Sequence, residues 1–203
     1  AVFGQVSLSE NPSFPPFLTA QRVGQKLGFK ATKALENNVI YSIGYSTRTL
    51  PEFLRELERR GITCLIDVRS SPWSRNQPFN ANQIERWSEK AGIMYRRAGD
   101  TLGGMVDFGL DDPAYLAALD RIINAACREP VAIMCAEGDP AQCHRTWDVG
   151  ASLLVRWGIV TLSILRDGRE EDITATLRRV TPSRIKPEIR AALDAQPDLF
   201  QGL

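Results

Sequence analysis

The chain has 203 residues, 43% of them hydrophobic and 24% charged, with a net charge of +1. These fractions are typical of a soluble globular domain that can bury a core of its own. No apolar run approaches the roughly 20 residues of a membrane-spanning helix, which excludes a membrane partner, and the near-zero net charge leaves any nucleic-acid role to local charge.

The four cysteines have no spacing typical of a disulfide framework, and two of them lie inside apolar segments. The first residues also lack a basic region followed by an apolar core. We therefore expect a protein of the reducing cytoplasm.

The first 38 residues show no sustained hydrophobic period, and the cluster Asn11–Pro16 is rich in residues that break regular structure. We interpret residues 1–38 as an N-terminal extension. A regular pattern then covers residues 39–180, which we take as one α/β domain. Residues 181–203 form a C-terminal tail.

Strands and helices alternate through this domain. Apolar segments of strand length are 39–44, 62–68, 93–97, 131–134 and 159–165, and helices are expected at 49–60, 81–91, 112–127 and 139–157. A helix ends at a glycine and a strand begins at once three times, at Gly61, Gly92 and Gly158, as in the short connections of βα units. The pattern predicts a single three-layer α/β domain with a mostly parallel sheet of about five strands flanked by helices.

The stretch Val131–Arg145 holds two of the four cysteines and the only histidine. Its apolar run is typical of a strand buried on both faces, which would end at Cys135. Asp139 followed by Pro140 predicts a helix start. The opening turns of that helix then carry a thiol, an imidazole and a guanidinium, on Cys143, His144 and Arg145.

Polar side chains follow the ends of the predicted parallel strands, and such ends meet at one edge of a sheet. These side chains are Ser46, Arg48, Asp67, Arg69, Glu137 and Arg145. A guanidinium can bind a phosphate or carboxylate through two hydrogen bonds, and a helix N-terminus attracts anions. We therefore expect a binding site for an anionic ligand. Alternatively, Asp67 pairs with one of the arginines and fixes the loops.

Cys143 is the candidate nucleophile of this site, because a thiol at a helix N-terminus beside histidine and arginine has a lowered pKa. Cys135 is then either a resolving thiol or part of the wall of the site, and His144 carries the proton in an acid–base step. Alternatively, the thiols are inert core residues and His144 is a structural hydrogen-bonding group. We expect no zinc site, because adjacent Cys143 and His144 would point in different directions on a helix.

The loop Ser70–Asn80 alternates aromatic, basic and amide side chains. Trp73 and Phe79 can stack on bases while Arg75 meets a phosphate, which predicts contact with a nucleic acid or nucleotide. A mobile loop that covers a small-molecule pocket would use the same residues. Leu102–Gly104 supplies a flexible backbone that can approach a ligand.

Several blocks of the sequence, taken in order, resemble the signatures of the domain of unknown function 488 family. The blocks are Ser42–Ser46, Asp67–Arg69, Leu102–Gly104, and Cys135–Glu137 with Cys143–Arg145. The resemblance covers residues 39–167 and implies a single α/β domain in prokaryotic cytoplasm, with no established reaction. Where the family usually has histidine after the first-strand glycine, this chain has Tyr45, which implies an altered site if that histidine is catalytic.

The end of the tail resembles a known docking peptide. Gln196, Leu199 and Phe200 are similar to the segment with which bacterial DNA-maintenance proteins bind the replication sliding clamp, where the Leu-Phe pair fills an apolar groove. A disordered C-terminus is a suitable place for such a segment. Alternatively, Leu199 and Phe200 fold back onto the domain.

Three functions are compatible with these residues. The leading hypothesis is a DNA-associated enzyme or processing factor that acts on a phosphate-bearing or otherwise anionic group at the Cys/His/Arg site. The second is a module that binds nucleic acid or protein without catalysis. The third is a redox sensor that joins Cys135 to Cys143.

Overall fold

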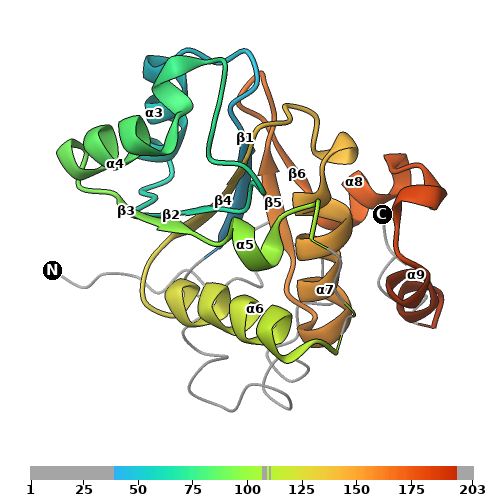
Figure 1. Ribbon diagram of the computed structural model, residues 1–203. Helices are drawn as coiled ribbons and strands as arrows, with labels where there is room; N and C mark the ends of the chain where they lie inside the picture. The colour runs from blue at the N-terminus through green and yellow to red at the C-terminus, as the bar shows by residue number, and fades with distance from the viewer. Residues whose placement is uncertain (1–38, 107–108, 110, 196–203) are drawn as a thin grey trace, which may run out of the picture.

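A computed structural model describes residues 39–106, 109 and 111–195 (Figure 1). The strands are β1 (Ile40–Gly44), β2 (Cys64–Asp67), β3 (Met94–Arg97), β4 (Val131–Cys135), β5 (Thr161–Ile164) and β6 (Glu170–Asp172). The helices of the same residues are α3 (Leu50–Glu58), α4 (Ala81–Lys90), α5 (Gly99–Leu102), α6 (Pro113–Ala126), α7 (Ala151–Trp157), α8 (Ile173–Arg179) and α9 (Pro187–Asp194). None of these helices is long and apolar enough to cross a membrane.

The strands form one sheet in the order β3-β2-β4-β1-β5-β6. The five strands from β1 to β5 are parallel to one another, and β4 is buried along its whole length between β2 and β1. The predicted parallel α/β sheet is therefore confirmed. Because β4 lies near the centre of the sheet, its last residue, Cys135, lies at the middle of the carboxyl edge.

The sixth strand, β6, was not expected from the sequence. It is antiparallel to β5 and follows a tight turn in which Gly168 has φ +82°. Its residues are Glu-Glu-Asp, so it has no apolar pattern that would predict a strand. Charged side chains of this kind are typical of a sheet edge, where they hinder pairing with another chain.

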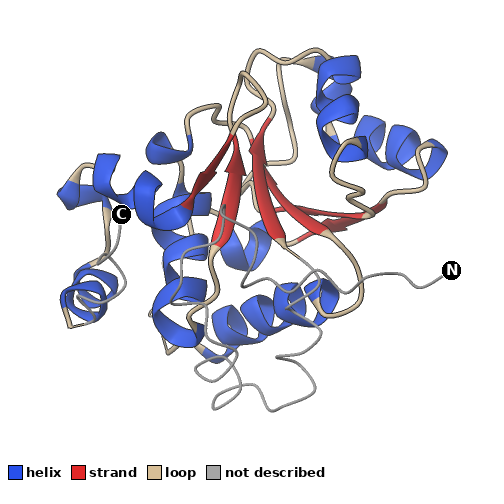
Figure 2. Cartoon of the chain, turned by 180° about the vertical axis from the view of Figure 1, so that it is seen from behind, coloured by secondary structure: helices blue, strands red, loops and turns tan. Residues whose placement is uncertain are grey.

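Helices cover both faces of the sheet, which gives the three layers (Figure 2). On one face, α3 and α4 pack through Phe53, Leu57 and Ile84 against Leu65 and other strand residues. On the other face, α6 packs through Tyr115, Leu119 and neighbouring residues, and α7 lies beside it. The loops at the carboxyl edge of the sheet therefore lie between the helices of one face and the helices of the other.

The local signals at helix ends were predicted correctly. Gly61, Gly92 and Gly158 have φ of +60°, +68° and +70°, the left-handed conformation that suits glycine after a helix. Thr49 caps α3: its hydroxyl accepts from the backbone N–H of Glu52, and the Glu52 carboxylate accepts from the backbone N–H of Thr49 at 2.7 Å. These ends fix where each strand begins.

The predicted C-terminal tail, residues 181–203, includes helix α9. Helix α9 packs its apolar face on the domain, where Ile185, Ile189 and Leu193 are buried with residues of α7 and α8. The short amphipathic segment had no strong cap to mark it in the sequence. The predicted clamp-binding residues Gln196, Leu199 and Phe200 lie outside the described residues.

Replacing Thr49 with alanine removes half of the α3 cap, so we expect the free energy of unfolding to fall by about 1 kcal/mol. Urea unfolding followed by circular dichroism measures the change. Thr47→Ala is the control, because Thr47 is exposed in the turn before the helix and its loss should stay within about 0.5 kcal/mol. Equal losses in the two variants would show that the cap does not stabilise α3.

Candidate functional site

The chain takes an unexpected path after β4. Asp139 caps a short 3₁₀ turn, Pro140–Gln142, and Cys143 then has an extended backbone with φ −128° and ψ 136°. The helix restarts after His144 as a π-helix, Arg145–Gly150, which leads into α7. The prediction that Cys143 lies in the first turns of a continuous helix is therefore wrong, because the 3₁₀ turn ends one residue before it.

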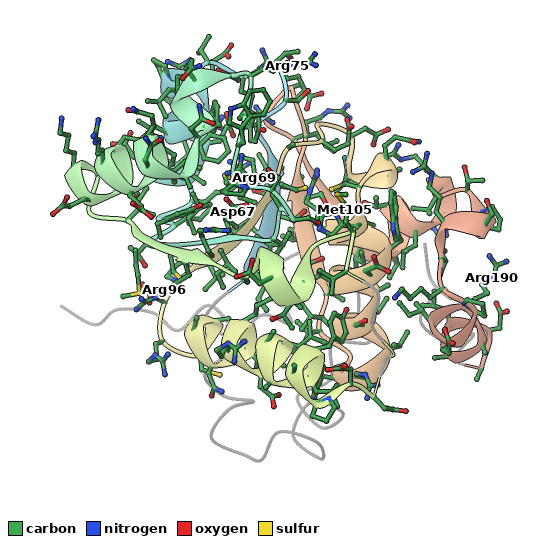
Figure 3. All side chains as sticks on the ribbon, viewed as in Figure 1. Asp67, Arg69, Arg75, Arg96, Met105 and Arg190 are labelled. Atoms are coloured by element: carbon green, nitrogen blue, oxygen red, sulfur yellow. The ribbon has the colours of Figure 1, made fainter. Side chains whose placement is uncertain are left out.

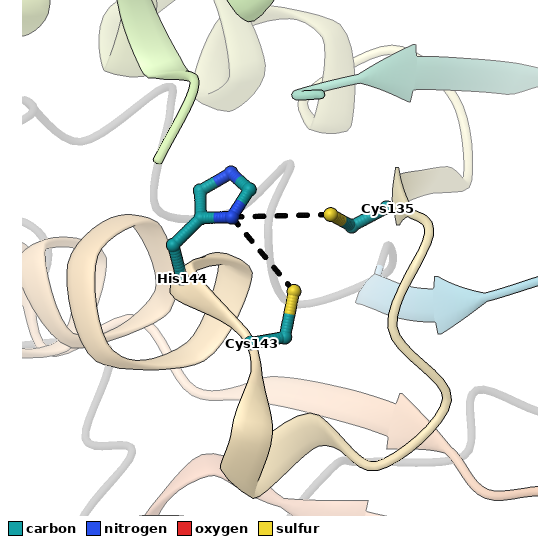
Figure 4. A group of neighbouring side chains, drawn as sticks. All are labelled: Cys135, Cys143 and His144. Carbon is teal, nitrogen blue, oxygen red and sulfur yellow. Dashed lines mark hydrogen bonds between the residues drawn. The ribbon is translucent and has the colours of Figure 1, made fainter. Parts of the chain in front are cut away.

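This break brings three side chains together (Figure 4). The His144 Nδ1 atom lies 3.8 Å from the Cys135 Sγ and 3.9 Å from the Cys143 Sγ. All three atoms lie within 4.8 Å of one another. We call Cys135, Cys143 and His144 the thiol site. Only 6% of Cys135 and 3% of Cys143 is exposed, so the imidazole is the most accessible member.

A hydrogen bond fixes the orientation of the imidazole. The His144 Nε2 atom lies 2.9 Å from the carbonyl oxygen of Val68, just after β2. A carbonyl oxygen only accepts, so Nε2 carries a proton and donates it. The other nitrogen, Nδ1, therefore faces the two sulfurs and is free to exchange a proton with them.

The backbone of Gly104 lies close to the His144 ring. A Cβ added at Gly104 would lie 2.8 Å from the His144 Cγ and 2.9 Å from its Nδ1. The predicted glycine backbone at Leu102–Gly104 thus approaches the protein's own imidazole. A side chain at this position would force the ring to move.

The two thiols of the thiol site have pKa values shifted in opposite directions. A hydrogen bond from the Cys135 thiol lowers the pKa of Cys143, and the charge of Arg145 and a hydrogen bond with His144 lower it further. The same bond with Cys143, together with burial, raises the pKa of Cys135. Burial lowers the pKa of His144, but the contact with Cys143 outweighs it, and the pKa lies above its usual value. The arrangement therefore favours a Cys143 thiolate beside a His144 imidazolium.

Arg145 lies next to the thiol site and is 1% exposed. Its guanidinium donates to the carbonyl oxygens of Glu137 at 2.6 Å and Gly138 at 3.3 Å. Its Nε, the Thr146 Oγ1 and the Asp148 Oδ1 are buried without a hydrogen-bond partner in the described part of the chain. Three unsatisfied polar atoms in one π-helix are unusual, and π-helices are frequent at functional sites.

Asp148 is a site residue that the sequence did not reveal. Burial raises the pKa of its carboxyl, and its charge acts on both His144 and Cys143. A polar residue within an apolar helix was the available signal. Its position in the expected helix gave no reason to place it beside the thiols.

Asp67 and Arg69 pair with each other, as the alternative prediction proposed (Figure 3). The Arg69 guanidinium donates to the Asp67 carboxylate at 2.6 Å and to the carbonyl oxygen of Phe79 at 2.8 Å. The Tyr95 hydroxyl also donates to Asp67 at 2.6 Å. Both charged residues are almost fully buried, so the pair holds the loop after β2 in place.

Arg48 has a comparable role at the other end of the edge. Its guanidinium donates to the carbonyl oxygens of Gly44, Ile164, Leu165 and Arg166, and only 3% of the residue is exposed. These bonds join the ends of β1 and β5. Anion binding by Arg48 and Arg69 stays a prediction, and an anion would compete with these internal partners.

Ser46 and Glu137 lie with Arg48 in a cleft of about 470 Å³ beside the ends of β1, β4 and β5. Ser46 has φ +36°, an uncommon conformation for a residue other than glycine. Gly138 passes close by, since an added Cβ would lie 3.0 Å from the Ser46 Cβ. Cys143 and His144 are not among the residues that line this cleft.

The loop after β2 exposes one of its two predicted aromatic residues. Trp73 is 65% exposed and Arg75 is also exposed. Figure 3 shows Arg75 at the top of the molecule, away from Asp67 and Arg69. Phe79 is buried and stacks on Tyr45, with ring centroids 4.3 Å apart. The prediction that Phe79 stacks on a base is therefore wrong. The hydroxyl of Tyr45, the residue that stands where the family usually has histidine, donates to the buried Ser74 hydroxyl at 3.0 Å.

The thiol site also has donors that suit a metal ion. Two sulfurs and one imidazole nitrogen are ligands of Zn²⁺, and bonds of about 2.3 and 2.1 Å at roughly tetrahedral angles place sulfur and nitrogen about 3.6 Å apart. The distances of 3.8 and 3.9 Å are close to this value. We expected no zinc site because Cys143 and His144 would point in different directions on a helix. That reason was wrong, because Cys143 is not helical and its sulfur lies 3.9 Å from the His144 Nδ1.

The comparisons with known proteins give one family model, which matches part of the chain. The model of the domain of unknown function DUF488 matches residues 49–107 and 109–147. No curated protein gives a significant match. A solved structure from Leishmania major, which carries the provisional name protein tyrosine phosphatase, is 14% identical and covers 80% of this chain and 77% of its own, with a TM-score of 0.34. A score this low carries no argument about function.

We expect part of the thiolate absorbance in the ultraviolet to be present at neutral pH and to disappear in Cys143→Ser, because the pKa of Cys143 is lowered. Titration of the absorbance difference between parent and variant measures it. Cys127→Ser is the control, since burial raises the pKa of Cys127. A parent whose thiols all titrate in the alkaline range would contradict the lowered pKa of Cys143.

Gly104→Ala should displace the imidazole and raise the pKa of Cys143 by about one unit or more, which corresponds to the loss of one interaction of about 1.4 kcal/mol. The same absorbance titration gives the pKa. Gly109→Ala is the matched control, because a Cβ at Gly109 meets nothing within 4 Å among the described residues. An unchanged pKa in Gly104→Ala would mean that the ring does not stabilise the thiolate.

Proposed function

We propose that this chain, which the DUF488 model matches over residues 49–147, is a thiol-dependent enzyme that acts on a phosphate-bearing or similar anionic group. The observation that carries the proposal is the convergence of two thiols on the His144 Nδ1, at 3.8 and 3.9 Å, beside the Arg145 charge. A nucleophile next to a base that a third group orients is the arrangement of covalent catalysis. Here the Val68 carbonyl oxygen orients the base.

The proposed step uses a phosphate ester as substrate. The Cys143 thiolate attacks phosphorus, an S–P bond forms, and the P–O bond to the leaving alcohol breaks while His144 gives that oxygen a proton. Water then attacks phosphorus and gives a proton to His144, and the S–P bond breaks to release phosphate and restore the thiolate. Arg145 adds positive charge near the transferred group, where negative charge develops.

Asp148 and Arg145 have buried polar atoms without described partners, and these atoms are candidates to meet the substrate. A bound group that satisfies them would recover the cost of burying them, about 1–3 kcal/mol for each atom. The proposal requires reduced thiols, so it also places the protein in a reducing compartment such as the cytoplasm.

The association with DNA is a separate part of the proposal. It rests on the exposed Trp73 and Arg75 of the loop after β2 and on the predicted clamp-binding residues of the tail. An exposed indole can stack on an unpaired base while a guanidinium meets a phosphate. A phosphorylated end of a nucleic acid is therefore the substrate class that we would test first.

The purified full chain should release phosphate from one member of a panel of nucleotides, phosphorylated oligonucleotides and small phosphate esters. Cys143→Ser should lower kcat by at least about a thousandfold, and His144→Ala by about a hundredfold. Phosphate release by the parent and the two variants measures the effect.

Cys127→Ser is the matched control and should keep full activity. Addition of a chelator distinguishes nucleophilic sulfur from zinc-bound sulfur, because only the second loses activity. Turnover that survives Cys143→Ser, or a parent without turnover on any member of the panel, would contradict the proposed function.

A thiol redox switch is a second candidate, favoured by the proximity of the Cys135 and Cys143 sulfurs, which lie within 4.8 Å of each other. The two thiols share a hydrogen bond, which raises the pKa of Cys135 and lowers the pKa of Cys143. An oxidant such as diamide would take two hydrogens from the pair and leave a disulfide.

Mild diamide treatment should remove two of the four free thiols, and mass spectrometry should find them in one Cys135–Cys143 crosslink. Cys135→Ser should abolish the crosslink, whereas Cys127→Ser should keep it. Four thiols that all stay reduced would exclude the switch and leave the enzyme proposal intact.

A further inference from the structure

A second hollow lies between the edge strand β3 and helix α6, with a volume of about 490 Å³. None of the thiol-site residues lines it. Its floor is apolar and belongs to the main core cluster, with Cys64, Ile66, Ala118, Ile122 and Ala125. Ala118 and Ala125 lie seven residues apart on α6, so their small side chains leave space along one face of the helix. We call this hollow the edge groove.

The rim of the edge groove is positively charged. Four arginines line it, Arg96, Arg97, Arg121 and Arg128, against one acidic residue, Glu129. Arg97 pairs with Asp100 at 3.8 Å, and Glu129 accepts from the Thr63 hydroxyl. The other three guanidinium groups have no hydrogen bond or ion pair to any residue that the structure describes. Arg96 is seen at the edge of the sheet, apart from Asp67 and Arg69 (Figure 3).

The main chain of β3 adds a second feature. Met94 and Ala98 donate their N–H groups toward β2, to the carbonyl oxygens of Thr63 and Asp67. In a parallel ladder alternate residues face opposite sides, so the N–H and C=O groups of Tyr95 and Arg97 point away from β2. Within the described residues β3 is the last strand on this side. No described strand pairs with its outer edge.

We propose that the edge groove binds an extended acidic peptide segment of a partner protein, which adds to the sheet beside β3. Side chains of an added strand alternate between the two faces, so every second one would lie over the groove. A carboxylate there meets the unpaired Arg96, Arg121 and Arg128, and its carbon chain meets the apolar floor. The outward groups of Tyr95 and Arg97 supply the main-chain hydrogen bonds.

Two alternative roles for the edge groove fit fewer of its features. Charged residues on an edge strand prevent unwanted pairing, but this role needs neither the two arginines on the α6 side nor the hollow that the alanines of α6 leave. A single-stranded nucleic acid needs flat side chains on which its bases stack, and no aromatic residue lines the groove.

The test uses the full chain and a fluorescein-labelled peptide of alternating Glu and Val. Fluorescence anisotropy should show saturable binding. The charge reversal Arg96→Glu, Arg121→Glu and Arg128→Glu should weaken Kd by at least about tenfold. The matched control reverses three exposed arginines outside the groove, Arg55→Glu, Arg86→Glu and Arg190→Glu, and should leave Kd within about twofold.

The same peptide with methylated backbone nitrogens tests strand addition, because it lacks donors, and it should lose binding. Four results would overturn the proposal: absence of saturable binding, equal binding of a Lys–Val peptide, unchanged binding of the methylated peptide, or tighter binding of oligothymidylate that the groove variant removes. Because the groove shares no residue with the thiol site, each result leaves the proposed enzyme activity untouched.

Discussion

The hydrogen bond between the His144 Nε2 and the Val68 carbonyl oxygen is the contact on which the candidate site depends. It joins the first residue after the extended Cys143 to the end of β2, two segments that are 76 residues apart in sequence. Because Nε2 is committed to this carbonyl, only Nδ1 can face the sulfurs. The parallel sheet makes the contact possible, since it places the ends of β2 and β4 next to each other.

The carboxyl edge of the sheet is held by buried charge. Arg48 binds carbonyl oxygens near β1 and β5, Arg69 binds Asp67, and Arg145 binds the loop after β4. Burial of an unpaired guanidinium would be costly, and these partners remove most of that cost. Among these charges, that of Arg145 helps the hydrogen bond from Cys135 to lower the pKa of Cys143.

Sequence reasoning succeeded where the signal is local. Glycine after a helix and the Thr49–Glu52 cap depend on neighbouring residues, and the buried strands depend on short apolar runs. It failed where a partner lies far along the chain or a pattern is absent. Three of the four carbonyl partners of Arg48 lie more than 100 residues away, at the end of β5 and just after it. Strand β6 has no apolar residue, and the extended Cys143 interrupts what looked like one helix.

The central claim is that His144 is an imidazolium whose Nε2 proton goes to Val68 and whose Nδ1 proton goes to Cys143. The chain has one histidine, so its two ring nitrogens give unambiguous signals in a ¹⁵N NMR spectrum. We predict that both nitrogens stay protonated to a higher pH than in an ordinary imidazole, because the contact with Cys143 raises the pKa of His144. Cys143→Ser should lower that pH and leave the neutral ring protonated at Nε2 alone. A parent ring that loses its second proton at or below the usual pH of an imidazole, or a neutral ring protonated at Nδ1, would contradict this prediction.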